Sequence, residues 1–375
     1  MQIDIYKEKI STYWRNIDKK ILLSFLLLFL LGLFFSFSST SSLAGERLNK
    51  DYYFFFSKHL IFVVMSLFLT FFISFLDLKD IQKTVIPIFI LLFIGLVLVP
   101  IVGVEVKGSK RWLNFYFFRI QPIEIIKPFF ILITAKILTL DEYKISGSSY
   151  LVSFLLLIAV TILLINQPDI GQSILLIGTW ISIVFISGIS FLYLLSFFGF
   201  SFLSLISLLF LFPEKFGYII NRLKTFFDST KGDSFQSEKA LNAIKQGGIK
   251  GQGMGEGILK DSVPEAHTDY IISVIAEEFG SIISILLISI FLYIAFRIIK
   301  ITIKQSNKNL KISLCGLSTL LVFQTFIHVG VNTSLLPTTG MTLPFLSYGG
   351  SSLLGSSVLA GLILNFTKKR FLEDE

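Results

Sequence analysis

The sequence predicts an all-α polytopic membrane protein with about ten transmembrane helices and a long extracytoplasmic loop between helices seven and eight. Hydrophobic residues fill 53% of the 375 positions and charged residues only 15%, against about a quarter in soluble domains. The apolar residues gather in runs of about 20, the helix length that crosses the hydrocarbon of a bilayer. These runs do not alternate apolar and polar positions, as the strands of a membrane barrel would.

Ten apolar runs are candidate spans, taken here in chain order. They cover residues 21–42, 59–76, 84–102, 120–138, 149–166, 170–187, 190–212, 270–298, 312–334 and 346–367. The first run is too long for the apolar region of a signal peptide, so we interpret it as a retained anchor. The fourth contains Glu124 and Lys127, and only the turn signal at 187–190 separates the sixth from the seventh.

The positions of lysine and arginine orient these spans. With the N-terminus inside, the inner segments hold 17 basic residues and the short outer loops hold 7. The inner residues are Lys7, Lys9, Arg15, Lys19, Lys20, Lys79, Lys83, Lys136, Lys144, Arg297, Lys300, Lys304, Lys308, Lys311, Lys368, Lys369 and Arg370; the outer ones are Arg47, Lys50, Lys58, Lys107, Lys110, Arg111 and Arg119. Because cytoplasmic loops carry the basic excess, both termini are expected in the cytoplasm. The predicted parts are a cytoplasmic N-terminal segment (1–20), a membrane domain (21–367) and a cytoplasmic C-terminal tail (368–375).

The predicted outer loop at residues 213–269 is long, and loops of this length are usually functional or disordered. It begins with apolar residues at helical spacing around Arg222 and Lys224, a pattern typical of a short helix lying on the membrane surface. It then passes through the glycine-rich stretch QGGIKGQGMGEG at 246–257.

Several function classes are disfavoured by composition. The net charge of +8 fits the basic loops of a membrane protein, so no nucleic-acid partner is expected. The single Cys315 excludes an internal disulfide. There is no Cys/His cluster for zinc or haem, and no phosphate- or dinucleotide-binding loop motif.

The charged residues in the fourth run need a physical reason, because a charge inside a membrane costs a few kcal/mol unless it is paired or faces a cavity. Glu124 and Lys127 are three residues apart, so they share a helix face and can pair. Two interpretations stay open. The pair either joins buried helices, or Glu124 steadies a lysine that is ready to bind phosphate.

Three further stretches carry polar residues. The basic segment before the fourth run, with Arg111 and Trp112, is either an interfacial anchor or a site for the diphosphate of a lipid-linked substrate. Asp169, in NQPDIGQ, is interpreted as turn chemistry. The uncharged stretch LLPTTGMTLPFLSYGGSS (335–352) predicts irregular backbone at membrane depth, where Ser347 either donates hydrogen bonds or helps to cap the last helix.

The stretch SVPEAHTDYIISVIAEEFG (262–280) concentrates carboxylates at the start of the eighth run. Asp269 either caps the helix, which suits the helix dipole, or does chemistry. Glu277 and Glu278 point about 80° and 180° round the helix from it, so we expect them to pair with different helices and to serve structure or coupling. His267 is either a neutral hydrogen-bonding residue or a proton carrier.

Four blocks, in order, resemble the SEDS family (shape, elongation, division and sporulation). They are KGSKRWLNF with QPIEIIKP, QPDIGQS, QGGIKGQGMGEG with PEAHTDYIISVIAEEFG, and LPTTGMTLPFLSYGGSSLL, and the resemblance covers roughly residues 15 to 370. The third block is closer to the FtsW division branch than to the RodA elongation branch. Ile123 and His328 depart from the family, which usually has a small polar residue and Asn there, so substrate positioning is put in doubt more than activity.

The resemblance implies a peptidoglycan glycosyltransferase that polymerises lipid II at the outer face of the bacterial cytoplasmic membrane. It implies Asp269 as general base, Lys127 and Arg111 at the diphosphate, and Glu124 orienting Lys127. The other substrate-binding residues expected are Trp112, Gln121, Arg222, Lys224, Glu265, His267, Thr268, Gly340, Ser347, Gly349 and Gly350. It leaves room for a divalent cation, Mg²⁺ or Mn²⁺, at the diphosphate, and it implies a class B penicillin-binding protein and other divisome membrane proteins as partners.

Three alternatives stay open beside a septal polymerase. The chain could be a RodA-like elongation polymerase, a lipid II flippase or transporter, or a scaffold that only recruits a transpeptidase. A transporter needs access from both faces, whereas the polar residues here gather toward the outer half.

Overall fold

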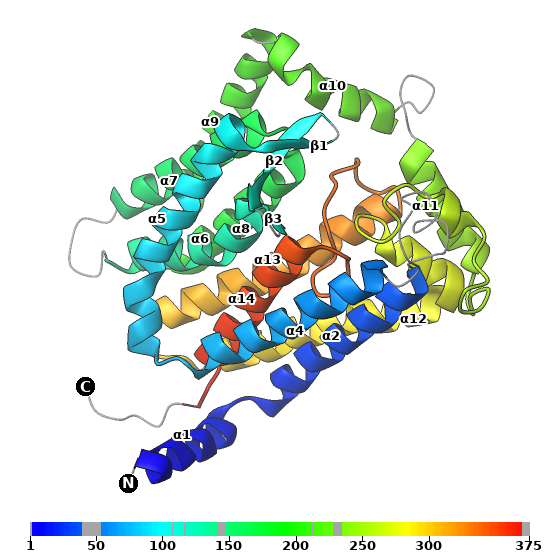
Figure 1. Ribbon diagram of the computed structural model, residues 1–375. Coiled ribbons are helices and arrows are strands. Elements are labelled where there is room, and N and C mark those ends of the chain that lie inside the picture. Colours follow the sequence, from blue (N-terminus) through cyan, green and yellow to red (C-terminus); the bar gives the residue numbers. More distant parts are fainter. Residues whose placement is uncertain are drawn as a thin grey trace.

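The chain is mainly helical, as the computed structural model shows for residues 2–39, 54–106, 108–115, 118–140, 148–211, 213–227 and 235–369 (Figure 1). Every predicted span coincides with a helix over most of its length. These helices are α2 (Lys19–Ser39), α4 (Phe54–Phe75), α5 (Leu78–Val102), α6 (Pro122–Thr139), α7 (Ser148–Asn166), α8 (Ile170–Ser187), α9 (Phe191–Leu211), α12 (Ile271–Thr302), α13 (Lys308–Asn332) and α14 (Gly350–Phe366). In the described part of the chain, seven of them are long and apolar enough to cross a membrane; α6, α9 and α14 are not among the seven.

The other elements lie outside the predicted spans. They are α1 (Gln2–Asn16), α10 (Pro213–Phe227), α11 (Phe235–Gly247), the short 3₁₀ helix η3 (Leu259–Ser262), and the strands β1 (Val104–Val106), β2 (Ser109–Phe115) and β3 (Phe118–Ile120). The strands form an antiparallel sheet in the order β1-β2-β3, with Glu105 opposite Lys110 and Leu113 opposite Ile120. The expected surface helix is α10, whereas the sheet and α11 were not predicted.

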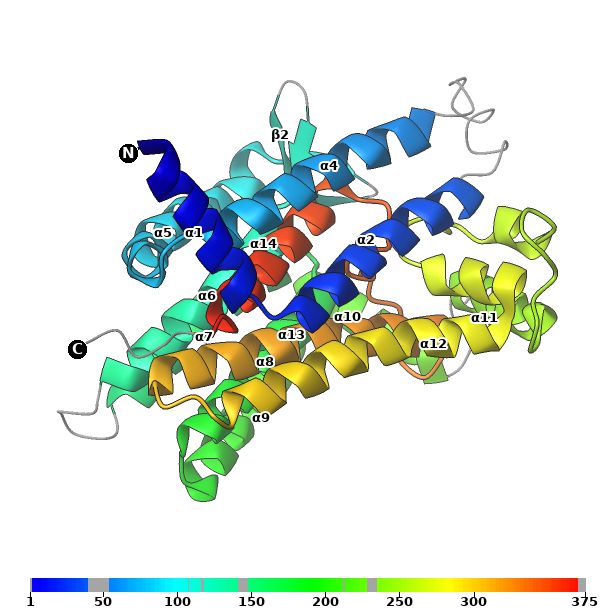
Figure 2. The same cartoon turned by 90° about the horizontal axis from the view of Figure 1, so that it is seen from below.

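The helices pack around α13 and α14. Helix α14 contacts α4, α6 and α13, while α13 also contacts α6, α8 and α12 (Figure 2). Close approach of α14 to α6 depends on Gly355, whose missing side chain leaves room for the main chain of Glu124. Asn365 of α14 donates to the carbonyl oxygens of Ile73, Ser74 and Leu76, at the end of α4.

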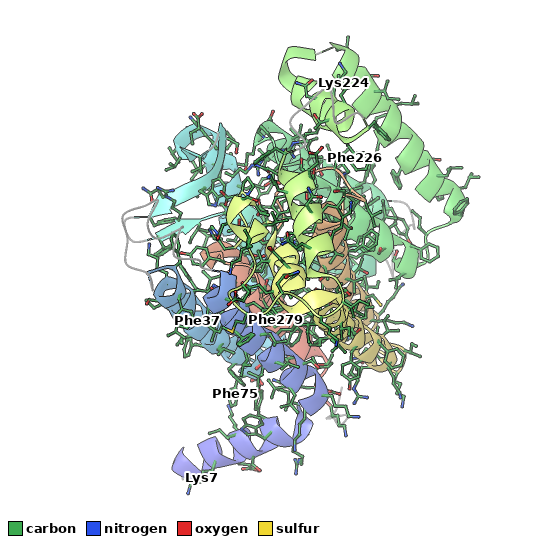
Figure 3. The ribbon with its side chains drawn as sticks, turned by 90° about the vertical axis from the view of Figure 1, so that its right-hand side faces the viewer. Lys7, Phe37, Phe75, Lys224, Phe226 and Phe279 are labelled. Atoms are coloured by element: carbon green, nitrogen blue, oxygen red, sulfur yellow. The ribbon has the colours of Figure 1, made fainter. Side chains whose placement is uncertain are left out.

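Both described ends of the chain lie at the same end of the molecule, which Figure 1 shows opposite to the sheet, α10 and α11. There the Lys369 amide donates to the Asn16 carbonyl (2.9 Å), and Arg297 of α12 pairs with Asp18 (2.8 Å). Figure 3 shows Lys7 of α1 at this end and Lys224 of α10 at the other, called the distal end below. The following parts of the predicted organisation lie outside the described residues: residue 1, 40–42 of the first span, Arg47, Lys50, Lys107, Lys144, residue 212 of the seventh span, 228–234 of the predicted outer loop, and 370–375 of the tail.

Helix α12 is broken at Gly280, where φ is 83° and ψ is 174°. The break leaves carbonyl oxygens without partners in the helix, and the glycine-rich segment 248–253 supplies donors for them. The amides of Gln252 and Gly253 donate to the carbonyls of Glu277 (2.9 Å) and Glu278 (3.0 Å), and the amide of Ser281 donates to Gly248 (3.0 Å). The glycine-rich segment therefore packs against the main chain of α12 at the break, and Gly251 stands where the two backbones come closest.

The side chains of Glu277 and Glu278 share one neighbour, Lys260 of η3, and only Glu278 also reaches α2, so the expectation of different helices is met only in part. The Glu277 carboxylate accepts hydrogen bonds from the backbone amides of Leu259 and Lys260, both at 2.7 Å. Glu278 pairs with the Lys260 ammonium group and accepts from the Ser38 hydroxyl of α2. Both carboxylates thus hold η3 against α12, and Glu278 adds α2 to the assembly.

The tight approach of the glycine-rich segment to α12 gives a testable prediction. Gly251 and Gly255 both have left-handed φ angles, 81° and 82°, but a Cβ on Gly251 would collide with the main chain at Glu278 and Phe279, whereas a Cβ on Gly255 meets open space. Gly251→Ala is therefore expected to lower the free energy of unfolding by about 1–3 kcal/mol more than Gly255→Ala, because both variants share the backbone strain and only one is overpacked. Thermal unfolding of the two variants in detergent measures the difference. Equal melting temperatures would contradict the packing described here.

Candidate functional site

Asp269 lies at the distal end, in a tight turn directly before α12. The turn starts at Glu265, which has a left-handed backbone with φ of 56°. The Glu265 carbonyl oxygen accepts from the amides of Thr268 (3.0 Å), Asp269 (3.1 Å) and Tyr270 (3.3 Å). The Thr268 hydroxyl donates to the Glu265 carboxylate (3.1 Å), so Glu265 organises the turn through both its main chain and its side chain.

The main chain on either side of Asp269 is fixed by three donors from the last third of the sequence. The Tyr348 amide donates to the His267 carbonyl (2.9 Å), the Ser347 hydroxyl donates to the Thr268 carbonyl (2.6 Å), and the Asn332 side-chain amide donates to the Asp269 carbonyl (3.1 Å). The imidazole of His267 also lies beside the rings of Phe55 and Tyr348, with centroids 5.8 and 5.7 Å away. The direction of the Asp269 side chain is therefore set by its surroundings.

The carboxylate of Asp269 meets Arg111 at Gly340. A Cβ on Gly340 would lie 3.5 Å from Oδ2 of Asp269 and 4.0 Å from Nη1 of Arg111. Gly340 has φ of 70°, a conformation that also favours glycine. Three predicted site residues from separate parts of the chain thus converge on one small space. The negative carboxylate of Asp269 and the positive guanidinium of Arg111 both border it.

Arg111 is held by the turn between α7 and α8. Its guanidinium donates to the carbonyls of Gln167 (Nε, 3.1 Å) and Pro168 (Nη2, 2.5 Å), and its Nε lies 3.9 Å from Oδ2 of Asp169. Asp169 caps α8 by accepting from the Gln172 amide (3.4 Å), as turn chemistry predicts. Burial raises the pKa of the Asp169 carboxyl, and the charge of Arg111 opposes that rise.

A second arginine reaches the same region from α10. Arg222 donates through Nη1 to the carbonyl of Thr338 (3.1 Å), two residues before Gly340. Burial raises the pKa of the Tyr270 hydroxyl, the charge of Asp269 raises it further and Arg222 lowers it, so both charged groups act on Tyr270. Lys224, in contrast, is exposed on α10 (Figure 3).

Glu124 and Lys127 form an ion pair buried between α6, α8 and α13. Their side chains are 2.8 Å apart, and the two residues are only 4% and 2% exposed. Gln172 of α8 donates to Glu124 (2.6 Å), and Lys127 donates to Gln324 of α13 (3.1 Å). A small cavity beside the pair is also lined by Gln324 and Ser356.

The remaining predicted residues fall into two groups. Gln121 and Trp112 precede α6 in the chain. The Gln121 side chain donates to Asp169 (3.2 Å), and Trp112 is half-buried on β2. Gly349 and Gly350 begin α14, and a Cβ on Gly350 would collide with the ring of Phe62 on α4. Gly350 is therefore needed for helix packing.

Two features of the site were not found from the sequence. One is the anchoring of Arg111 by the turn at Gln167 and Pro168, which links two of the quoted blocks. The other is Asn332, which lies four residues after His328 and eight after Gln324 in an apolar helix. That spacing places all three on one helix face and was the available signal.

No metal site is formed by protein ligands alone in the part of the chain that the structure describes, since no three His, Cys, Asp or Glu side chains gather at one point. The positive charge near Asp269 comes from Arg111 and Arg222. The donor set therefore does not fit a cation held by the chain itself.

The chain is similar to known proteins over nearly its whole length. Residues 18–371 match the FtsW/RodA/SpoVE family model, described as cell cycle protein. A probable peptidoglycan glycosyltransferase FtsW of Caulobacter vibrioides is 32% identical, covering 96% of this chain and 92% of that protein. The corresponding protein of Coxiella burnetii is 33% identical, covering 95% and 98%.

Solved structures share the fold. A chain from a peptidoglycan synthase complex, described by its coordination of polymerization and crosslinking, superposes with a TM-score of 0.76 at 25% identity, covering 94% of this chain and 97% of that one. The rod shape determining protein RodA of Thermus thermophilus gives 0.68 at 24% identity, covering 94% and 96%. The predicted class, a helical polytopic membrane protein, is confirmed by this likeness. The chain therefore belongs to the FtsW/RodA/SpoVE family of cell cycle proteins, the SEDS family that its four sequence blocks resemble.

Proposed function

We propose that this chain is a peptidoglycan glycosyltransferase of the bacterial cytoplasmic membrane, polymerising lipid II for septal synthesis in cell division. The names of the Caulobacter and Coxiella relatives support the reaction class. The observation that carries the proposal is the meeting of Asp269 and Arg111 at Gly340. A polymerase needs a base for the incoming hydroxyl and positive charge for the departing diphosphate, and both groups border this one space.

The proposed reaction is an inverting displacement. The 4-hydroxyl of the acceptor sugar attacks the anomeric carbon of the donor and forms the new glycosidic bond. Asp269 accepts the hydroxyl proton, while the bond from the anomeric carbon to the lipid diphosphate breaks and its electron pair leaves with the diphosphate. One carboxylate is sufficient because an inverting displacement needs no protein nucleophile, and the diphosphate leaves as a stable anion that needs no proton from a general acid.

Arg111 and Arg222 suit the leaving diphosphate. Arginine presents a planar fork of donors that matches phosphate oxygens, and its charge persists at every physiological pH. Two guanidinium donors of Arg111 are bound by neutral carbonyls, which fix the plane of the group and leave Nη1 toward Gly340. Arg222 is likewise oriented by a carbonyl, that of Thr338.

The remaining assignments are part of the same proposal. Lys127 would contact the diphosphate, oriented by Glu124. The other substrate contacts would come from Trp112, Gln121, Lys224, Glu265, His267, Thr268, Gly349 and Gly350. Ser347 is not among these contacts, because its buried hydroxyl binds Thr268 and Leu343. The distal end would face outward, with residues 1–20 and 368–375 in the cytoplasm and 213–269 as the outer loop. A class B penicillin-binding protein and other divisome membrane proteins would be its partners, for which the similarity to a chain of a peptidoglycan synthase complex is the support.

The base is tested by Asp269→Asn. Removing the carboxylate is expected to slow polymerisation about 10²–10⁴-fold, because proton acceptance is lost while the shape is kept. Purified protein is incubated with lipid II, and glycan strands are followed on a gel. Glu256→Gln, an exposed carboxylate in the same loop, is the matched control and should polymerise normally. Normal polymer from Asp269→Asn would refute the base assignment, and movement of lipid II between leaflets without polymer from the unaltered protein would refute the enzyme.

The role of Lys127 is tested with its partner. Lys127→Met alone leaves a buried carboxylate uncompensated and is expected to cost about 3–5 kcal/mol of unfolding free energy, whereas Glu124→Gln/Lys127→Met removes both charges and should recover most of it. Thermal unfolding of both variants measures this. If Lys127 stabilises the leaving diphosphate, the double variant should stay at least about 100-fold slow despite its recovered stability. A double variant that polymerises normally would show that the ion pair serves only to join helices.

A further inference from the structure

Three buried polar residues follow one face of α13 at intervals of four: Gln324, His328 and Asn332. This set is called the α13 polar stripe. Side chains at this spacing lie above one another along a helix, so the stripe faces one side. All three residues are buried, although polar groups are costly in such surroundings unless they are hydrogen-bonded.

Each member of the stripe binds a backbone carbonyl outside its own helix. Gln324 donates to Thr342 (3.1 Å), His328 Nδ1 contacts the Met341 carbonyl (2.7 Å), and Asn332 donates to Asp269 (3.1 Å). Because a carbonyl oxygen only accepts, His328 must carry its proton on Nδ1. The stripe therefore holds the irregular segment after α13 and, at its distal end, the residue proposed as the base.

Asn332 makes contacts on both sides of the point where α12 begins. Its Nδ2 donates to the Asp269 carbonyl, while its Oδ1 accepts from the hydroxyl (2.7 Å) and the amide (3.3 Å) of Ser273 in the first turn of α12. One side-chain amide thus ties Asp269 and the helix start to α13. The residue is 0% exposed, so substrate does not reach it.

Ser347 makes a parallel connection one residue earlier. Its hydroxyl donates to the Thr268 carbonyl (2.6 Å) and accepts from the Leu343 amide (2.8 Å). The peptide unit between Thr268 and Asp269 and the one that follows it therefore both have a bound carbonyl. Neither peptide plane can rotate without breaking a hydrogen bond, so the direction of the Asp269 side chain is restricted.

We infer that Asn332 and Ser347 are positioning residues that aim the Asp269 carboxylate at the acceptor hydroxyl. This inference rests on the proposed function, in which Asp269 is the base. The same stripe begins at Gln324, whose Oε1 accepts from the Lys127 ammonium group (3.1 Å). One helix face therefore extends from Lys127 to the main-chain carbonyl of Asp269. Asn332 and Ser347 each give one hydrogen bond to the main chain beside Asp269. An error of about 1 Å in the placement of a reacting group costs about 100-fold in rate.

The test uses Asn332→Ala and Ser347→Ala in the full-length protein, purified in detergent and supplied with lipid II. Each is expected to lower kcat by about 10- to 100-fold while KM for lipid II changes less than about twofold, since neither side chain touches substrate. Thr325→Val is the matched control. It removes a buried hydroxyl of α13 that binds only its own helix, at Leu321 (2.9 Å), and should keep normal kcat and KM.

The outcomes separate this inference from the proposed function. If Asp269→Asn is inactive while both alanine variants keep the normal kcat, positioning is refuted and the base stands. A rise in KM at unchanged kcat would also refute positioning, because it would assign the two residues to substrate binding. If Asp269→Asn polymerises normally, the base assignment and this inference fall together. Should Asn332→Ala fail to insert or fold, Ser347→Ala decides alone, with its melting temperature compared with that of Thr325→Val.

Discussion

Backbone polar groups that leave a helix at membrane depth must find hydrogen-bond partners inside the protein, because hydrocarbon offers none. The distal half of this molecule is organised by that requirement. The break at Gly280 is satisfied by amides of the glycine-rich segment, and the irregular segment at 341–342 is satisfied by Gln324 and His328. The turn at 265–269 is satisfied within itself and by α13. The site is therefore a place where irregular backbone is tolerated because buried side chains bind it.

Charge follows a related rule. Glu277 and Glu278 are bound by amides and by Lys260, and Glu124 is bound by Lys127 and Gln172, so these carboxylates are used by the fold. Arg111 differs because its hydrogen bonds go to neutral carbonyls, while the carboxylate of Asp169 lies 3.9 Å away. These contacts orient the guanidinium and leave Nη1 toward the space at Gly340. Glu124, Glu277 and Glu278 therefore stabilise the fold, whereas Arg111 is oriented toward the space that Asp269 also borders.

Much of the fold followed from the sequence, since each apolar run of helical length became a helix. The sheet at 104–120 could not be predicted in the same way, because strands of three to seven residues carry too little periodicity and their pairing depends on partners along the chain. Glu277 and Glu278 were assigned to structure from their angles round one helix, which is local information.

The meeting of Asp269 with Arg111 is a contact between distant segments, so the sequence suggested the two residues without showing that they lie together. Asn332 shows the limit most clearly: its spacing from Gln324 and His328 was visible, but its partner lies 63 residues away.

The interruption of α12 separates the short piece at 271–279 from the long remainder that runs toward the termini. This piece is attached to the glycine-rich segment at one end and carries Asp269 just before the other. A displacement of residues 248–253 would therefore act first on the short piece, because the break at Gly280 separates it from the rest of α12. Residues 248–253 are thus coupled mechanically to the turn that holds Asp269, even though they are remote from it in the chain.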